Sequence, residues 1–216
     1  INFPAMMLLG VPVHSAIAAN KFSNTLSSFS TFLTLLIEKK ISLKIVLTVV
    51  PFPILGGLTG GWLSSTLSES TMSKVAIVLL SFAILMTFVK KPVLKSEADV
   101  HLPKKLLPGV YGVGVYDGMF GPGQGTLLLY LFFHAGIPYL TAIALARFTT
   151  FLSCFSAAVM YTLNGHMMWS VAVPLAIGSL TGAQIGVRLA HRLSVHHVKR
   201  LLQVLTSLLI VQLVVE

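Results

Sequence analysis

The sequence predicts an all-α fold class: a polytopic bundle of transmembrane helices, built from two inverted repeats and containing broken or re-entrant helices. Hydrophobic residues make up 55% of the 216 residues and charged residues only 10%, whereas ordinary globular domains carry about 25% charged residues. Apolar segments close to the ~20 residues that cross a bilayer follow one another along the chain. We therefore expect a multi-pass protein of the cell (plasma or inner) membrane.

Short turns separate most of the apolar segments, but residues 90–105 form a longer polar connection rich in lysine. This connection divides the chain into a first repeat at 1–89, a basic loop at 90–105 that we expect in the cytoplasm, and a second repeat at 106–216. Helices are expected at 12–36, 41–67, 72–89, 106–120, 126–135, 138–163, 167–190 and 197–215.

Residues 116–126 interrupt the apolar sequence with four glycines and a proline. Helices tolerate these residues poorly, because glycine loses backbone entropy and proline lacks an amide donor. Unwound backbone at membrane depth occurs only where protein or a water-filled cavity satisfies its polar groups, and in transporters such breaks lie at the substrate site. The alternative is a tight re-entrant turn that binds nothing.

An internal repeat is visible in the sequence. Residues 10–24 match residues 136–150: both begin with Gly-x-Pro, both continue through an Ala-Ile-Ala segment, and the match places Lys21 on Arg147. The second repeat opens with the broken helix pair, so we expect the first repeat's counterpart of that pair to precede Ile1.

The distribution of basic residues predicts the orientation of the repeats. If 106–135 crossed the membrane once, the basic turns would be split between the two faces. If it enters and returns to the same face, most basic residues gather there, and the positive-inside rule makes that face cytoplasmic. The repeats are then inverted, as in many secondary transporters. Twelve of the fifteen Lys and Arg residues share this face: Lys39, Lys40, Lys44, Lys90, Lys91, Lys95, Lys104, Lys105, Arg188, Arg192, Lys199 and Arg200.

Lys21 and Arg147 lie well inside apolar helices at matching positions of the repeat. Ionisable side chains are costly there and usually mark a pathway or a partner, so two such cations suit a central site for an anion. The alternative is that both side chains reach the headgroups or pair with a carboxylate. We predict that further substrate contacts come from polar neighbours on the same helices and from the break: Asn20, Asn24, Ser27, Ser28, Thr149, Thr150, Ser153, Gly121, Gly123, Gln124 and Gly125.

Asp117 is the only acidic residue well inside the apolar sequence. It is either a proton-coupling carboxylate or the counter-ion of Arg147 when no substrate is bound. Equally, it can be a structural carboxylate that pairs with backbone amides at the helix break.

Other features argue against an enzyme. The sequence contains no nucleotide-binding loop, nucleophile elbow or metalloprotease helix, and its histidines lack metal-ligand spacing, so we expect no cofactor and no metal. No soluble basic domain is available for nucleic acid. The glycine runs at 56–61 and 178–186 follow the small-xxx-small spacing of closely packed helices, and the single Cys154 permits no intrachain disulfide.

The order of these motifs resembles a known family. A Tyr-Asp-Gly segment leads into the glycine-rich break, followed by Gly136-x-Pro138, the helix that carries Arg147, the small-residue helix, and Gly165-His166 close to a tryptophan. This is similar to the sulfite/sulfonate exporter (TauE/SafE) family, a TSUP-type group of membrane transporters. The segment around Asn20 and Lys21 is similar to that family's Thr-Asn-Lys-Leu-Gln segment.

The resemblance implies a secondary transporter that exports small sulfur-containing anions such as sulfite, sulfoacetate or thiosulfate by alternating access. Arg147 and Thr150 stand where members of the family often have Lys and Asn, which leaves the substrate open because arginine binds oxyanions as a planar fork and lysine as a point charge. The expected partners are the anion, the bilayer and, in a homo-oligomer, further copies of the chain. The alternative function is a passive anion channel or a non-transporting membrane scaffold.

Overall fold

The computed structural model describes residues 3, 6, 7, 9–38, 41, 43–88 and 103–190, and all regular elements of this part are helices. In chain order they are α2 (Val13–Ile37), α3 (Leu43–Val49), α4 (Pro51–Thr66), α5 (Glu69–Phe88), the short 3-10 helix η1 (Lys104–Leu106), α6 (Leu107–Met119), α7 (Gln124–His134), α8 (Tyr139–Leu163) and α9 (Trp169–Ala190).

The helices expected between residues 12 and 190 are confirmed, with ends that differ by only a few residues. One expected helix, 41–67, is divided into α3 and α4 at Val50 and Pro51, because proline cannot donate a backbone hydrogen bond. The expected helix 197–215 and most of the 90–105 connection lie outside the described residues. So do many of the basic residues used for the orientation: Lys39, Lys40, Lys90, Lys91, Lys95, Arg192, Lys199 and Arg200.

Polar and apolar side chains are distributed as expected for a bundle surrounded by lipid. By length and composition, two described helical stretches qualify as membrane spans, Ile45–Thr66 and Tyr139–Leu163. Large apolar side chains such as Leu47, Val78 and Ile177 are exposed on the outside of the bundle. Fully buried polar side chains lie inside: Lys21, Ser23, Ser64, Thr149 and Ser153.

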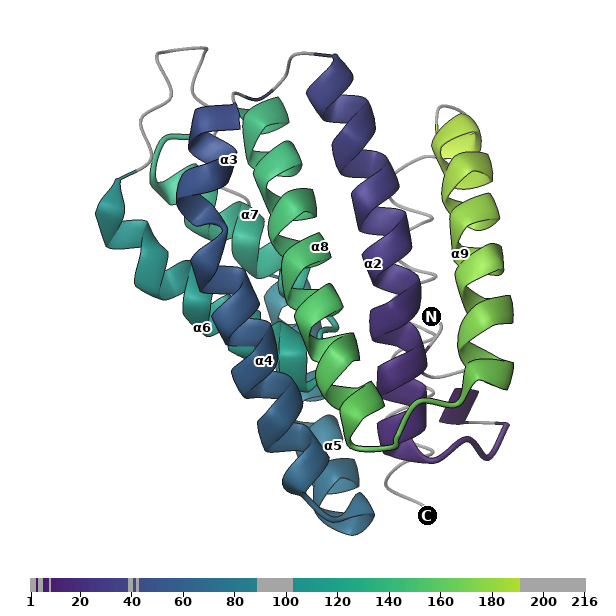
Figure 1. Cartoon of the computed structure of the whole chain (residues 1–216). Coiled ribbons are helices and arrows are strands. Elements are labelled where there is room, and N and C mark those ends of the chain that lie inside the picture. Colours follow the sequence, from purple (N-terminus) through teal and green to yellow (C-terminus); the bar gives the residue numbers. More distant parts are fainter. Residues whose placement is uncertain are drawn as a thin grey trace.

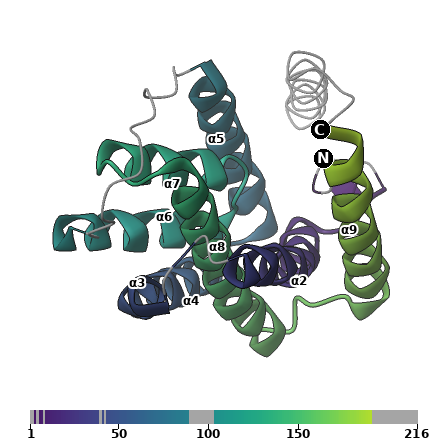
Figure 2. The same ribbon diagram turned by 90° about the horizontal axis from the view of Figure 1, so that it is seen from above.

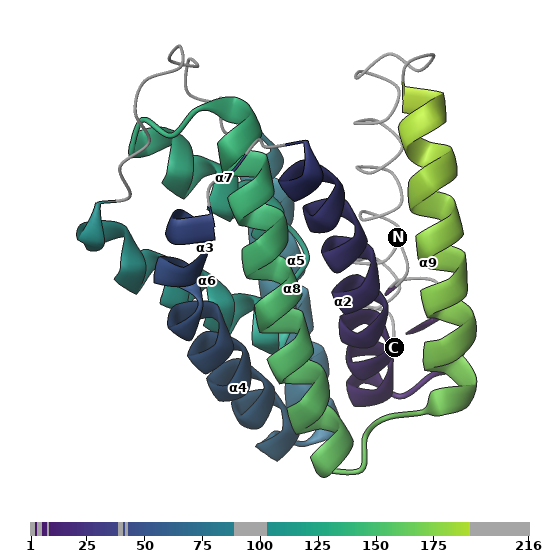
Figure 3. The ribbon, with the colours of Figure 1, turned by 45° about the horizontal axis from the view of Figure 1, so that its top comes forward.

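Two long helices, α2 and α8, form the centre of the bundle and pack against each other. Each has 25 residues, and they run in opposite directions: α2 ends and α8 begins at what we call the upper end of the bundle (Figure 1). Helix α4 covers α8 on one side and α9 lies beside α2 on the other (Figure 2). Helix α6 slopes inward from the edge of the bundle, and α7 returns from the middle toward the upper end (Figure 3).

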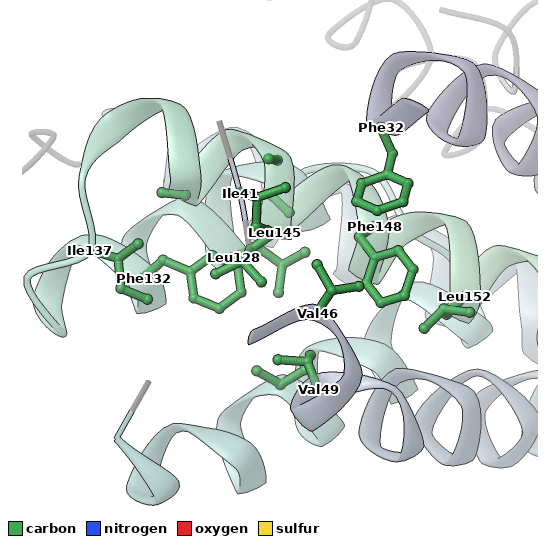
Figure 4. Close-up of a cluster of buried hydrophobic side chains, with 14 residues drawn as sticks. Phe32, Ile41, Val46, Val49, Leu128, Phe132, Ile137, Leu145, Phe148 and Leu152 are labelled. Carbon is green, nitrogen blue, oxygen red and sulfur yellow. The ribbon is translucent and has the colours of Figure 1, made fainter. Parts of the chain in front are cut away.

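Two apolar clusters stabilise the upper and lower parts of the bundle. The upper cluster includes Phe32 of α2 and Phe148 of α8, whose ring centroids are 4.6 Å apart (Figure 4). The lower cluster includes Ala16 of α2, Tyr161 of α8 and Phe120 after α6. Both α2 and α8 contribute residues to each cluster, and on each helix a polar segment lies between these two groups of residues.

The first turn of α2 is capped by a residue distant in sequence. Pro12, at the N-cap position, makes no side-chain hydrogen bond, and the Glu69 carboxylate of α5 instead accepts the Val13 amide at 3.0 Å. The His14 ring places Nδ1 2.7 Å from Glu69 Oε1 and Nε2 2.8 Å from the Ser64 carbonyl oxygen. These contacts join α2, α4 and α5 at the lower end, where the carboxylate also complements the positive end of the helix dipole.

Glycines on α4 allow it to pack directly on the backbones of α6 and α8. An added Cβ at Gly56 would lie 2.6 Å from the Tyr111 carbonyl oxygen, and added Cβ atoms at Gly57 and Gly60 would collide with Ser153 and Val115. Close packing is thus confirmed for this glycine run. For Gly178 and Gly182, no described atom lies within 4 Å of an added Cβ.

Two glycines of α6 provide a matched test of this packing. We expect Gly118→Ala to destabilise the protein by about 1–3 kcal/mol, because its Cβ would lie 2.7 Å from the Gly57 carbonyl oxygen. Gly112→Ala, with no atom within 4 Å among the described residues, should be neutral or slightly stabilising. Thermal unfolding midpoints of the purified proteins in detergent measure the difference. Equal midpoints for the two variants would contradict the packing of α4 on α6.

Candidate anion site

Residues 120–123 break the helix between α6 and α7 in the middle of the bundle (Figure 1). Gly121 and Gly123 have φ angles of 100° and 83°, which favour glycine because other residues meet steric strain there. The Tyr116 hydroxyl of α6 donates to the Pro122 carbonyl oxygen and holds the turn closed. The composition that predicted a break therefore provides the conformations that the break requires.

The carbonyl end of α6 is satisfied by side chains of neighbouring helices. The Ser64 hydroxyl of α4 donates to the Met119 carbonyl oxygen at 3.0 Å, and the Tyr161 hydroxyl of α8 lies 3.3 Å from the same oxygen. The last carbonyl groups of a helix receive no hydrogen bond from within that helix, so a buried helix end needs donors from elsewhere in the protein. The negative end of the α6 dipole therefore faces protein donors.

The amide end of α7 lies at a cavity of about 460 Å³. The Thr126 amide donates to the Gly123 carbonyl oxygen at 2.9 Å, while the Gly125 amide has no acceptor among the described residues. The cavity is bounded by α2, by the first two turns of α7 and by α8. Its lining residues are Asn24, Ser28, Gly123, Gln124, Gly125, Thr126, Leu129, Ile143, Ala146, Arg147 and Thr150.

Arg147 supplies a cation to this cavity. Its side chain is exposed, and neither a carboxylate nor a hydrogen-bond acceptor contacts it within the described part of the chain. The amide end of α7 adds the positive end of a helix dipole. An unpartnered guanidinium beside helix amides and hydroxyl groups suits an anion, because each of these groups can donate to oxyanion oxygens.

A side-chain pair lies at the inner wall of the cavity. The Gln124 amide nitrogen donates to the Thr150 hydroxyl oxygen at 2.9 Å, and the Thr150 hydroxyl lies 2.8 Å from the Ala146 carbonyl oxygen. Both side chains are buried. This pair connects the first turn of α7 to α8 and thereby fixes the wall that carries Arg147.

A buried ion pair lies deeper in the bundle, between Lys21 of α2 and Asp117 of α6. Lys21 Nζ is 2.8 Å from Asp117 Oδ1, and the two side chains are 0% and 3% exposed. The second carboxylate oxygen, Oδ2, accepts hydrogen bonds from the Ser153 hydroxyl and from the Cys154 thiol at 3.3 Å. A carboxylate at this depth needs such partners because the loss of hydration is costly.

The ion pair bears on two predictions. Asp117 was expected to be a proton-coupling carboxylate, the counter-ion of Arg147 or a partner of backbone amides, and its charged partner in the structure is Lys21. Lys21 was expected either to flank one site with Arg147 or to pair with a carboxylate; it has a carboxylate partner and is not among the residues that line the cavity. Within the described residues Asp117 is the only acidic side chain that pairs with Lys21, whereas Arg147 remains available at the cavity.

Gly121 is required at the ion pair for a steric reason. An added Cβ would lie 2.5 Å from Lys21 Nζ and 2.7 Å from Asp117 Oδ1. The backbone of the break therefore closes directly over the two charged groups, and only glycine leaves room for them.

Comparison with known proteins assigns the family. The family model described as sulfite exporter TauE/SafE matches residues 1–213. The chain belongs to the TauE/SafE family. A probable membrane transporter protein, ORF9, of Sinorhizobium is 28% identical over the whole chain and 84% of its own length. Similar proteins from Haemophilus influenzae (27%) and Escherichia coli (YfcA, 26%) match 88% of this chain and 75% and 71% of their own lengths. No solved structure matches the chain.

Membership of the TauE/SafE family makes the protein a membrane transporter and not an enzyme. In the described part of this TauE/SafE chain, no three His, Cys, Asp or Glu side chains come together as metal ligands would. The cavity is a candidate binding site for a transported solute.

About half of the predicted site residues meet at the cavity: Asn24, Ser28, Gly123, Gln124, Gly125, Arg147 and Thr150. Two others belong to the ion pair or its surroundings, since Ser153 donates to Asp117 and Gly121 packs on it. Asn20, Ser27 and Thr149 do not line the cavity. Ser27 donates to the Asn24 carbonyl oxygen of its own helix at 3.3 Å.

Sequence reasoning missed several cavity residues: Thr126, Leu129, Ile143 and Ala146. One of them was accessible from helical spacing, because Ile143 precedes Arg147 by one turn. Leu129 carries no polar signal, and its position follows only from the packing of α7 on α8.

The two cations should differ in their effect on stability. We expect Lys21→Met to destabilise the protein by about 3–5 kcal/mol, because it leaves the Asp117 carboxylate buried without a counter-ion. Adding Asp117→Asn should recover part of that loss. Arg147→Met is the control and should have little effect, since no partner is lost within the described residues. Denaturant unfolding in detergent measures these values, and a Lys21→Met protein as stable as Arg147→Met would disprove the structural role of the pair.

Proposed function

We propose that this protein is a multi-pass transporter of the cell membrane that exports a small sulfur-containing oxyanion, such as sulfite, sulfoacetate or thiosulfate, by alternating access. The observation that carries this proposal is the Arg147 side chain, which is unpartnered within the described residues and lies beside the amide end of α7 in a cavity of about 460 Å³. Oxyanions with several oxygens can use both kinds of donor at once.

The architecture of inverted repeats is part of the proposal. Its support is the correspondence of α2 and α8, which have the same length and opposite directions (Figure 1). Each follows a glycine of positive φ, 75° at Gly10 and 76° at Gly136, and each has a proline at its N-cap position. In such repeats the helix break lies at the substrate site, which agrees with the position of Gly123 on the cavity wall.

The substrate class follows from charge and from the family. A cavity that offers a cation, a helix amide end and hydroxyl groups, without an acidic lining residue, favours an anion over a cation or a neutral solute. The matching family is described as sulfite exporters, from which we take the direction of transport and sulfur oxyanions as the substrate class. Arginine favours a planar or trigonal arrangement of oxygens because its donors form a fork.

Arg147→Ala should reduce oxyanion flux by about 10- to 100-fold, the loss expected when charge-assisted hydrogen bonds to the substrate are removed. Arg147→Lys keeps the charge without the fork and should fall between Arg147→Ala and the wild type. Sulfite flux into liposomes measures the effect, with the thermal midpoint showing that the variants remain folded. Wild-type flux in Arg147→Ala would reject the site.

Saturable flux that is stimulated by substrate on the opposite side distinguishes a carrier from a passive channel.

A proton requirement at Asp117 is a separate proposal. The carboxylate is the only acidic side chain buried among the described residues, so it is a candidate to carry a proton with the anion. Asp117→Asn should then make flux independent of an imposed pH gradient, because an amide cannot take up the proton. Flux measured with and without the gradient tests this, and an unchanged response in Asp117→Asn would remove Asp117 from the coupling.

A further inference from the structure

The Asp117 carboxylate occupies a set of donors that would equally suit a free anion. One of its oxygens is 2.8 Å from Lys21 Nζ, and the other accepts from the Ser153 hydroxyl and the Cys154 thiol. These groups come from α2 and α8, whereas Asp117 comes from α6. The donors and the acceptor thus belong to different elements.

The polar lining of the cavity continues to these donors on both long helices. On α2, Asn24 lines the cavity and Lys21 lies one turn deeper. On α8, Thr150 lines the cavity and Ser153 lies one turn deeper. Because residues three or four apart lie on the same side of a helix, both helices carry a polar path from the cavity to the ion pair.

Thr149 provides an independent observation: a second buried hydroxyl on the Ser153 side of α8, one that lacks a hydrogen-bond partner within the described residues. Its hydroxyl is fully buried and has no hydrogen-bond partner among the described residues, although the neighbouring Thr150 bonds to the carbonyl oxygen one turn before it. A buried hydroxyl without a partner is destabilising and calls for an explanation. Thr149 precedes Ser153 by one turn and shares its side of α8, so an oxygen of a bound anion beside Ser153 would be within its reach.

We propose that Lys21, Ser153 and Thr149 form a second, deeper anion subsite, which the Asp117 carboxylate occupies as a built-in ligand while substrate is absent. This rests on the proposed function, in which an oxyanion enters at Arg147. Two anions at one buried lysine repel each other, so the substrate and the Asp117 carboxylate exclude each other there. The ligand class is a small anion with at least two oxygens, the geometry that the carboxylate itself presents.

Removal of the built-in ligand tests the subsite directly. Asp117→Ala leaves the three donors and vacates the volume of a carboxylate group, so formate should bind there. We expect sodium formate to raise the thermal midpoint of purified Asp117→Ala by at least about 2 °C, saturably, and to leave the wild type unchanged. Lys21→Met/Asp117→Ala is the matched control, with the same vacated volume and no cation, and should not respond. Sodium chloride at equal ionic strength controls for salt.

No formate response in Asp117→Ala, or an equal response in Lys21→Met/Asp117→Ala, would overturn the subsite. If Asp117→Ala does not fold, Asp117→Asn replaces it: calorimetry should show formate binding at least about tenfold tighter than to the wild type, because the competing charge is gone, and Lys21→Met/Asp117→Asn should lose this gain. The subsite is also rejected if Asp117→Asn binds formate no more tightly than the wild type, or if Lys21→Met/Asp117→Asn binds formate as tightly as Asp117→Asn. The readout requires no transport, so a failed Arg147 site would leave formate binding unaffected.

Discussion

The helix break between Met119 and Gln124 is the constraint on which the rest of the structure depends. Backbone groups freed in the middle of a membrane-embedded bundle must find partners there. The Met119 carbonyl oxygen finds Ser64 and Tyr161, which are possible partners only if α4 and α8 approach α6 closely. The glycines of α4 allow that approach, since added Cβ atoms at Gly56 and Gly57 would collide with neighbouring helices. The packing of three helices therefore follows from the need to satisfy one broken helix.

The two ends of the break have different environments, and this difference produces the electrostatic character of the site. Hydroxyl groups of the protein cover the carbonyl end of α6, while the amide end of α7 is left at the cavity with Arg147. The Asp117 charge is compensated by Lys21, so it does not cancel the positive field at the cavity. Lys21 and Arg147 hold matching positions in the proposed repeat but have different surroundings: Lys21 is paired with a buried carboxylate, and Arg147 lines the cavity without a partner among the described residues. A lysine suits the first because it acts as a compact charge, and an arginine the second because it can bind two oxygens.

Much of the fold could be predicted from the sequence, because helix length and composition are local properties. The N-terminal ends of α2 and α8 could be predicted from the Gly-x-Pro sequences that precede them, and the break could be predicted from the glycines at 121 and 123. The roles of Lys21 and Asp117 could not be predicted, since their pairing depends on how deeply α6 enters between α2 and α8. Arg147 was predicted as a site residue and lines the cavity, but its lack of contact with Asp117 could not be predicted. The sequence gives no reason to prefer one partner of Asp117 over another, because the choice depends on the distances from its carboxylate to Lys21, to Arg147 and to the backbone amides.

The polar segments of α2 and α8 lie between the two apolar clusters, and this position indicates which contacts must break if the protein alternates access as proposed. The upper cluster around Phe32 and Phe148 and the lower cluster around Phe120 and Tyr161 enclose the segment of α2 and α8 that holds Lys21 and Ser153. The lower cluster lies on the side of the ion pair away from Arg147, and it is joined to the break by the hydrogen bonds of Tyr161 to Gly118 and Met119. An anion that passes from the cavity beyond Lys21 therefore meets this cluster next. In alternating access the lower cluster would therefore have to separate from the helix break to open the side of the protein away from Arg147. The Tyr161 hydroxyl cannot both cap α6 and admit a solute between α6 and α8.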